Sequence, residues 1–423
     1  LAQHVSMQVR LCSVAGEEVA SLEAELSWTT QDLRAKVRHL REQACVRARF
    51  FRAGEELQRQ VVLQTLAEAG TLSLSVLWTR APYILTDAGE CAKIWDAESG
   101  ECVRKLAGHT HEIISLIFSP DGTRVLTASA DRTAKLWDAE SGECAQTLAG
   151  HDGAVCSAKF SPDGTRVLTA SVDHVAKVWD TESGECMHTL TGHEGEVKLA
   201  VFSPDGTKVL TSSADHVAKL YVAKLWDAAS GKCRQSFMGN AGRVGSALFS
   251  PDGTRVLTVA ESTANIWAVE SGQRVFTLKA HKGGVLSTAF SPDGESVLTA
   301  SADCTAKVWA AKSGDCMRTL VGHTDMVWTA EFAPDGVRVC TASDDCTAKI
   351  WDAESGECMN TLAARGHGCV FSASFSQDGM WVSTIDEDRT LKLWDAESGE
   401  CIKILGCDGE VSCGEFSPSQ SVS

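Results

Sequence analysis

Histidine, serine, aspartate and tryptophan recur along the chain at constant spacing, which raises the question of Ser-His-Asp catalysis. The four types stand at equivalent positions in four segments: His109, Ser129, Asp131 and Trp137; His151, Ser171, Asp173 and Trp179; His281, Ser301, Asp303 and Trp309; His323, Ser343, Asp345 and Trp351. Nucleophilic catalysis needs one site with one activated nucleophile and an oxyanion hole. Four equal copies therefore indicate architecture, and we predict no catalytic residue and no enzyme activity.

The elements that position these residues come from an internal repeat. A tryptophan, usually followed by Asp, recurs about every 42 residues, at Trp95, Trp137, Trp179, Trp226, Trp267, Trp309, Trp351 and Trp394. Between successive tryptophans the same marks return in order: Ser-Gly, Gly-His, an alternating apolar run, Ser-Pro-Asp-Gly, a second alternating run and Asp. Alternation predicts β-strands, and Pro and Gly predict the tight turns between them.

A period of about 40–45 residues with Gly-His and Trp-Asp marks is typical of a β-propeller built from four-stranded blades. The chain resembles the WD-repeat (WD40) family over about residues 82–418. The resemblance implies a mostly β fold with an eight-bladed propeller; seven blades is the alternative, because the first repeat is degenerate. It also implies protein or peptide partners. No metal-ligand spacing or phosphate-binding loop is visible, so we expect no cofactor and no metal.

In this family the repeated polar residues form a hydrogen-bonded tetrad. The resemblance implies that Asp131 accepts from His109 and that His109 bonds to the Ser129 hydroxyl, which also accepts from the indole of Trp137. Such a chain would satisfy buried donors and acceptors.

Three repeats depart from the pattern. After His193 both Tyr221 and Trp226 are candidates for the indole position, because Val-Ala-Lys-Leu is duplicated. The next repeat has Asn240, Val259 and Glu261 in place of His, Ser and Asp, and the last has Asp386 in place of Ser.

The propeller is predicted to span residues 79–423. The first repeat begins at about Pro82 and contains only three strands, whereas residues 409–418 match one further inner strand. We expect this segment to complete the first blade, which would remove the open edges of the ring.

Residues 1–78 contain no repeat and form a separate predicted domain. They show β-like runs at 7–11 and 18–26, a turn near Val14, an amphipathic helix over 31–43, and short strands at 49–52 and 72–77. This order resembles ubiquitin, so we predict a small α+β ubiquitin-like β-grasp domain. The apolar recognition patch of that family would correspond to Val14 and Phe51, weakened by Ser75.

Charge and cysteine usage limit the partners and the compartment. The net charge of −17 argues against nucleic acid and against an anionic membrane. No apolar run approaches a membrane span, and no signal peptide is visible. Seven cysteines share one repeat position: Cys102, Cys144, Cys186, Cys233, Cys316, Cys358 and Cys401. We expect them to be small buried hydrophobic residues in a reducing compartment, the cytoplasm or nucleus.

The binding site is predicted where residues vary on a constant framework. Positions three and five after each His begin the inner strands and should face the central opening. There Trp328 and Phe371 fall in adjacent blades, and aromatic residues are enriched in interface hot spots. Acidic positions would favour a basic residue in the ligand. The candidates are Trp328, Phe371, Met326, Arg243, Glu112, Glu196 and Glu410. The alternative is that Trp328 packs as ordinary core between blades.

Two hypotheses about function remain. The first is a non-catalytic scaffold that binds protein or peptide partners on the propeller faces, which is an analogy from the fold. The second is a ubiquitin-pathway adaptor, whose ubiquitin-like domain docks on a proteasome or ligase component while the propeller selects substrates. Ligase adaptors of the family often carry Trp-Asp-x-Arg, whereas Asp-Ala-Glu follows Trp95, Trp137, Trp351 and Trp394 here. The sequence therefore favours the scaffold.

Overall fold

The computed structural model describes residues 6–12, 18–25, 46–52, 55–56, 71–80, 82–213, 220–241, 244–279, 281–363, 368–405, 411 and 413–418. The chain divides into two compact units, Leu1–Pro82 with Ser419–Ser423, and Tyr83–Pro418. All regular elements in the described residues are strands. Within these ranges no helix is found that is long and apolar enough to cross a membrane.

Five strands of the first unit form one sheet in the order β2-β1-β5-β3-β4. They are β1 (Ser6–Cys12), β2 (Glu18–Glu25), β3 (Val46–Arg52), β4 (Glu55–Glu56) and β5 (Thr71–Arg80). Strands β1 and β5 are parallel, and the other neighbours are antiparallel. The predicted turn at Val14 and the predicted helix lie outside the described residues. A ubiquitin-like fold for this unit stays a prediction.

The second unit consists of four-stranded antiparallel sheets, eight of them in the described residues. The first four blades contain β6 (Tyr83–Ala88), β7 (Cys91–Asp96) and β8 (Cys102–Ala107) with β37 (Gly414–Phe416); β9 (Ile113–Phe118), β10 (Arg124–Ser129), β11 (Thr133–Asp138) and β12 (Cys144–Ala149); β13 (Val155–Phe160), β14 (Arg166–Ser171), β15 (Ala176–Asp180) and β16 (Cys186–Leu190); β17 (Val197–Phe202), β18 (Lys208–Ser213), β19 (Leu220–Asp227) and β20 (Cys233–Ala241).

Blades 5 to 8 follow the same plan. They contain β21 (Val244–Phe249), β22 (Arg255–Ala260), β23 (Thr263–Ala268) and β24 (Arg274–Leu278); β25 (Val285–Phe290), β26 (Ser296–Ser301), β27 (Thr305–Ala310) and β28 (Cys316–Val321); β29 (Val327–Phe332), β30 (Arg338–Ser343), β31 (Thr347–Asp352) and β32 (Cys358–Ala363); β33 (Val370–Phe375), β34 (Trp381–Asp386), β35 (Leu391–Asp395) and β36 (Cys401–Leu405). The prediction of eight blades is confirmed, and seven blades is wrong.

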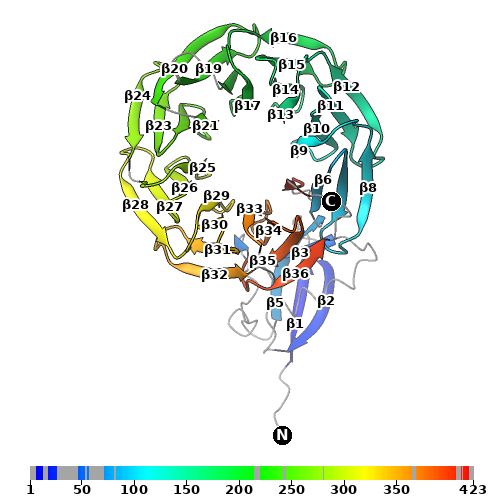
Figure 1. Cartoon of the computed structure of the whole chain (residues 1–423). Coiled ribbons are helices and arrows are strands. Elements are labelled where there is room, and N and C mark those ends of the chain that lie inside the picture. Colours follow the sequence, from blue (N-terminus) through cyan, green and yellow to red (C-terminus); the bar gives the residue numbers. More distant parts are fainter. Residues whose placement is uncertain are drawn as a thin grey trace. The chain divides into compact units, whose positions relative to one another are not determined.

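The blades form a ring around a central axis (Figure 1). The first strand of each of blades 2 to 8 lies toward the axis, and strands such as β12, β16 and β28 run along the rim. Strand β37, near the C-terminus, pairs antiparallel with β6 in blade 1, where Gly414 lies opposite Thr86. Blade 1 therefore combines strands from the two ends of this unit, which closes the ring of blades.

The hydrophobic core lies between neighbouring blades. One cluster joins Leu126 and Leu136 of blade 2 to Val155, Val167 and Trp179 of blade 3, all nearly inaccessible to water. Alternation along each strand places apolar side chains on the blade faces, and the next blade covers them. Each blade therefore depends on its neighbours for burial.

The seven repeated cysteines are exposed, so the prediction that they are buried is wrong. Each begins the outermost strand of its blade, opposite the Trp and at a register shift, as Cys144 lies opposite Trp137. No further strand of the blade covers this outer edge. The expectation of burial followed the usual behaviour of a free cysteine as a small hydrophobic residue, whereas the outermost strand of a blade lies at the rim, where these side chains face water.

The duplicated segment in blade 4 lengthens a hairpin. Strands β19 and β20 extend until Leu220 pairs with Ala241 and Tyr221 with Asn240. Trp226 donates its indole N–H to Thr211 Oγ1 at 2.8 Å, so Trp226 and not Tyr221 occupies the indole position.

Candidate functional site

The repeated polar residues form a buried hydrogen-bond chain inside each regular blade. In blade 2, His109 Nδ1 lies 2.7 Å from Asp131 Oδ2, and His109 Nε2 lies 2.8 Å from Thr127 Oγ1. Trp137 Nε1 donates to the same Thr127 oxygen at 2.8 Å. Because that oxygen accepts from the indole, its own proton is available for Nε2, which leaves the histidine proton on Nδ1 for Asp131.

The electrostatics of the chain favour a neutral imidazole. Burial lowers the pKa of His109, and this effect outweighs the opposing influence of Asp131. Burial opposes ionisation of Asp131, but hydrogen bonds from Thr133, His109 and Thr110 prevail and lower its pKa to about 2. The pair therefore combines a carboxylate with a neutral His at neutral pH.

The sequence assigned the hydroxyl of this chain to Ser129, and that assignment is wrong. Ser129 Oγ donates to the His111 carbonyl and accepts from the Asp131 backbone N–H, so it fixes the loop beside the chain. Thr127 and Ser129 are two residues apart on the same side of β10, and the indole reaches the one farther from the loop. The same correction replaces Ser171, Ser301 and Ser343 by Thr169, Thr299 and Thr341.

The hydrogen bond from the tryptophan indole to the threonine is kept in blades that lack other residues of the repeated hydrogen-bond chain. In blade 5, which lacks the His and Asp, Trp267 still donates to Thr258 at 2.8 Å. In blade 8, Trp394 donates to Thr384, while Asp386 pairs with the ammonium group of Lys392. A Thr in the second strand recurs in all eight repeats, and this constancy could have identified the hydroxyl from the sequence. This hydrogen-bond chain is repeated around the ring and buried, so its role is structural.

Three residues at the start of consecutive inner strands form what we call the axial sector: Leu286, Trp328 and Phe371. The rings of Trp328 and Phe371 meet edge to face, with centroids 6.3 Å apart and planes inclined by 70°. Phe371 is 43% exposed and Leu286 is 36% exposed, whereas Trp328 is partly buried. Such pairs stabilise each other beyond the area they bury. The contact holds Trp328 in place and leaves the Phe371 ring accessible.

Sequence reasoning missed Asp344, which orients the tryptophan of the axial sector. Trp328 Nε1 donates to Asp344 Oδ1 at 2.5 Å. The middle residue of Ser-x-Asp is Ala130 in blade 2 but Asp344 in blade 7, and this exception was the available signal. Burial, together with Asp344 and Glu387 nearby, raises the pKa of Cys369 to about 11. The carboxylates of Asp344 and Glu387 therefore place negative charge beside the axial sector.

The other predicted binding residues are less closely associated with the axial sector. Met326 is partly buried, and its backbone carbonyl accepts from Asp344 N–H at 3.0 Å. Glu112 is exposed in blade 2. Glu196 forms an ion pair with Lys198, five residues after His193, so a ligand would compete with that lysine.

Several predicted residues cannot be placed in the site. Arg243 and Glu410 lie outside the described residues, as does Val14 of the ubiquitin-like patch. Phe51 belongs to β3, and the description of that strand covers its backbone alone. Among the described residues, no group of three or more His, Cys, Asp or Glu side chains is arranged to hold a metal.

The repeats match a known family model, the WD domain, G-beta repeat. The matches cover residues 100–138, 142–180, 184–221, 231–268, 272–310, 314–352 and 356–395. The chain belongs to the WD40 repeat family.

Individual relatives are more distant. An uncharacterized WD repeat-containing protein of Schizosaccharomyces pombe is 39% identical over 51 residues, which are 12% of this chain and only 13% of that protein. The crystal structure of the computationally designed Ika8 protein is similar with a TM-score of 0.64 and 26% sequence identity, over 73% of this chain and 91% of the designed chain.

Proposed function

We propose that this protein is a non-catalytic interaction scaffold that binds a protein or peptide segment at the axial sector. The observation that carries the proposal is the exposed Phe371 ring held against Trp328 at positions where other blades carry unrelated residues. Exposed aromatic residues backed by a fixed neighbour are typical of interface hot spots. The WD40 family is rich in interaction scaffolds, which supports the same class by analogy.

The ligand is expected to combine an apolar anchor with a basic residue. The anchor would contact Phe371 and Leu286, and the basic residue would be attracted by Asp344, Glu387 and, across the ring, Glu112. The net charge of −17 disfavours nucleic acid and an anionic membrane as partners. Cytoplasmic or nuclear localisation remains part of the proposal, supported by the free thiols between Cys91 and Cys413.

Selection from a library of short random peptides tests the scaffold proposal. The purified full chain should enrich peptides with an apolar residue near Lys or Arg, and Phe371→Ala should lose those peptides. Ile114→Ala is the matched control, because Ile114 holds the equivalent position in blade 2 with 39% exposure. The proposal fails if the enriched peptides bind Phe371→Ala as tightly as the wild type.

The ubiquitin-pathway adaptor is the second candidate. Its support is the sheet order β2-β1-β5-β3-β4 with a parallel central pair, which suits a ubiquitin-like β-grasp fold. Affinity capture from the native cell should compare the full chain with residues 79–423. Loss of every partner on removal of residues 1–78 would favour the adaptor, and unchanged capture would favour the scaffold.

A further inference from the structure

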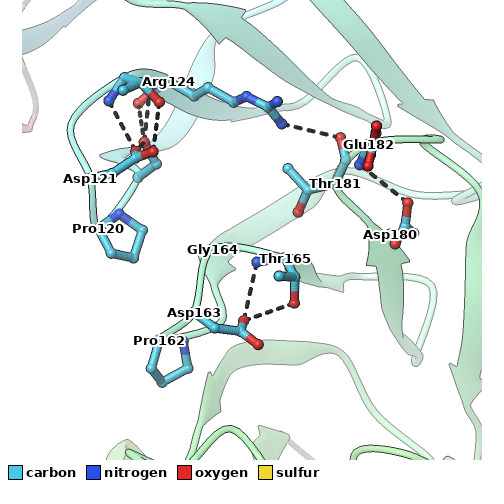
Figure 2. A pocket seen from close by; sticks show the side chains of 12 residues that line it. Pro120, Asp121, Arg124, Pro162, Asp163, Gly164, Thr165, Asp180, Thr181 and Glu182 are labelled. Atoms are coloured by element: carbon cyan, nitrogen blue, oxygen red, sulfur yellow. Dashed lines mark hydrogen bonds between the residues drawn. The ribbon is translucent and has the colours of Figure 1, made fainter.

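The opposite face of the ring carries a cavity of about 650 Å³ between blades 2 and 3. Connections of a four-stranded meander alternate between its two ends, so the Ser-Pro-Asp-Gly turns lie away from the loops that precede the inner strands. Two such turns line the cavity, with residues 119–121 and 123–124 in blade 2 and residues 162–165 in blade 3, together with residues 180–182 at the end of β15 (Figure 2). Its volume lies within the range of small-ligand pockets, about 300–1,000 Å³.

One buried side chain of this cavity is unsatisfied. Thr181 is 3% exposed, and its Oγ1 has no hydrogen-bond partner. Its hydroxyl oxygen points toward the turn that holds Gly164 and Thr165 (Figure 2). The equivalent residues of the other blades lack a hydroxyl: Ala97, Ala139, Ala228, Val269, Ala311, Ala353 and Ala396. A buried hydroxyl without a partner destabilises a fold, so its presence at one position calls for a ligand that satisfies it.

The lining of the cavity is strongly acidic. It contains Asp121, Asp163, Asp180 and Glu182 against the single cation of Arg124. The Arg124 guanidinium donates to the carbonyl of Thr181, which holds it at the side of the cavity (Figure 2). In blade 4, by contrast, Arg234 pairs with the Asp that corresponds to Asp180.

Asp163 and Asp180 are ionised, and each keeps its Oδ2 oxygen for a ligand. The hydrogen bonds from Ser161 and Thr165 all go to Asp163 Oδ1, and those from Glu182 and Ser183 all go to Asp180 Oδ1. The Ser161 hydroxyl lowers the pKa of Asp163, and the Ser183 backbone N–H lowers that of Asp180. Both carboxylates can therefore attract a cation without giving up the bonds that form their turns.

We propose that this cavity binds a primary alkylammonium group. The ammonium would donate to the acidic oxygens and to the Thr181 hydroxyl, and its methylene chain would lie against Pro120 and Pro162, which supply apolar surface. A lysine side chain of a protein and a free polyamine share this chemistry. The site is separate from the axial sector and does not depend on the proposed function.

The chain itself supplies the matched variant. In blade 4 the corresponding turn reads Asp227-Ala228-Ala229-Ser230-Gly231, and it keeps the same hydrogen bonds from Ser230 to Asp227 Oδ1. The double substitution Thr181→Ala and Glu182→Ala gives blade 3 that turn without disturbing its capping residues. Folding should be retained, and removal of the unpaired hydroxyl should not lower the midpoint of thermal unfolding.

Threonine methyl NMR of the full-length protein tests the proposal directly, because Thr123, Thr165 and Thr181 all line the cavity. Titration with a capped Gly-Lys-Gly peptide and with spermidine should shift the Thr123 and Thr165 methyl signals in a saturable way. Tighter binding of the lysine peptide would identify a protein ligand, and tighter binding of spermidine a free polyamine. The double variant should bind either probe about tenfold more weakly, as expected for the loss of a hydrogen bond to a charged group.

Two controls test whether binding needs the ammonium group and whether it needs the turn of blade 3. A capped Gly-norleucine-Gly peptide lacks the ammonium group and should leave the signals unchanged. The pair Thr254→Ala and Glu270→Ala in blade 5 removes a hydroxyl and a charge from other turns and should leave binding intact. The proposal is overturned if neither amine gives saturable shifts at Thr123 and Thr165, or if the double variant of blade 3 binds as tightly as the wild type.

Discussion

Blade 7 contains two tryptophans whose surroundings give them opposite roles. Trp351 is 1% exposed, donates to Thr341 at 2.8 Å and has an equivalent in every blade. Trp328 is partly exposed and donates to Asp344, and the other blades carry no tryptophan at this position. The first tryptophan joins the third strand of its blade to the second and packs against blade 6, and the second forms part of a surface. Residue type therefore says little here, and departure from the repeat is the better guide to binding.

The same rule applies to the other face of the ring. Asp163 belongs to a turn that every regular blade repeats, whereas Thr181 stands where the other blades have Ala or Val. Asp344 and Thr181 are both polar exceptions in a framework that is otherwise constant. Substitutions in the framework should change stability, and substitutions at the exceptions should change binding.

The largest expected effect is the difference in the free energy of unfolding between variants of the two tryptophans. Trp351→Ala should lower the free energy of unfolding by about 3–5 kcal/mol, because it leaves a cavity between blades. Trp328→Ala should cost about 1 kcal/mol, since it removes an edge-to-face contact and one hydrogen bond at a partly exposed position. Chemical denaturation of both variants measures the difference. Equal losses would mean that Trp328 is ordinary core.

The next effect separates two hydroxyls of β30. Thr341→Val should cost about 1–3 kcal/mol, because it leaves the indole N–H of Trp351 and Nε2 of His323 without their partner. Ser343→Ala removes the bonds to the Asp325 carbonyl and the Asp345 N–H beside a loop, which should cost about 1 kcal/mol. Denaturation midpoints with unchanged slopes check the order. A larger loss for Ser343→Ala would restore the assignment made from the sequence.

The sequence predicted the ring because the ring depends on periodic features. Trp spacing, strand alternation and turn residues repeat eight times, so an error in one repeat does not change the blade count. The hydroxyl was harder to assign, because Thr127 and Ser129 both recur and lie on the same side of one strand. Only the distance to the Trp137 indole separates them, and no spacing rule contains that distance.

Part of the candidate site could not be predicted from the sequence either. The position of Trp328 and Phe371 in adjacent blades followed from the repeat count, and their mutual contact is a matter of side-chain direction. Asp344 was missed because a second acid in Ser-Asp-Asp looks like ordinary surface charge. The exposure of Cys144 and its equivalents was mispredicted, because free cysteines are usually buried and here they begin the outermost strand of each blade.

The smallest expected effect is a dependence of the free energy of unfolding on pH, which comes from Glu331 and Glu415 on inner strands. Burial and the neighbouring Glu415 raise the pKa of Glu331 to about 8, and burial raises that of Glu415 to about 7 against the influence of Lys159. A carboxyl whose pKa is raised on folding stabilises the protein below its unfolded value of 4.5 and loses that contribution as pH rises through 7 to 8. The free energy of unfolding should therefore fall between pH 4.5 and 8.

Glu331→Gln tests this pH effect, because glutamine keeps the shape and removes the titration. The variant should show a flatter pH dependence than the wild type, with a smaller change than that of Thr341→Val because Glu331 is partly exposed. Glu354→Gln, at an exposed turn, is the control and should leave the slope unaltered. Identical slopes for Glu331→Gln and the wild type would show that Glu331 titrates normally.

The most direct test of the central claim measures peptide affinity and stability together for Trp328→Ala. A peptide selected on the wild-type chain is titrated into the variant, and the unfolding of the same preparation is followed in denaturant. The account predicts that affinity falls by at least about tenfold, as for a hot-spot residue, while the free energy of unfolding falls by about 1 kcal/mol. Unchanged affinity, or a loss of stability as large as that of Trp351→Ala, would contradict it.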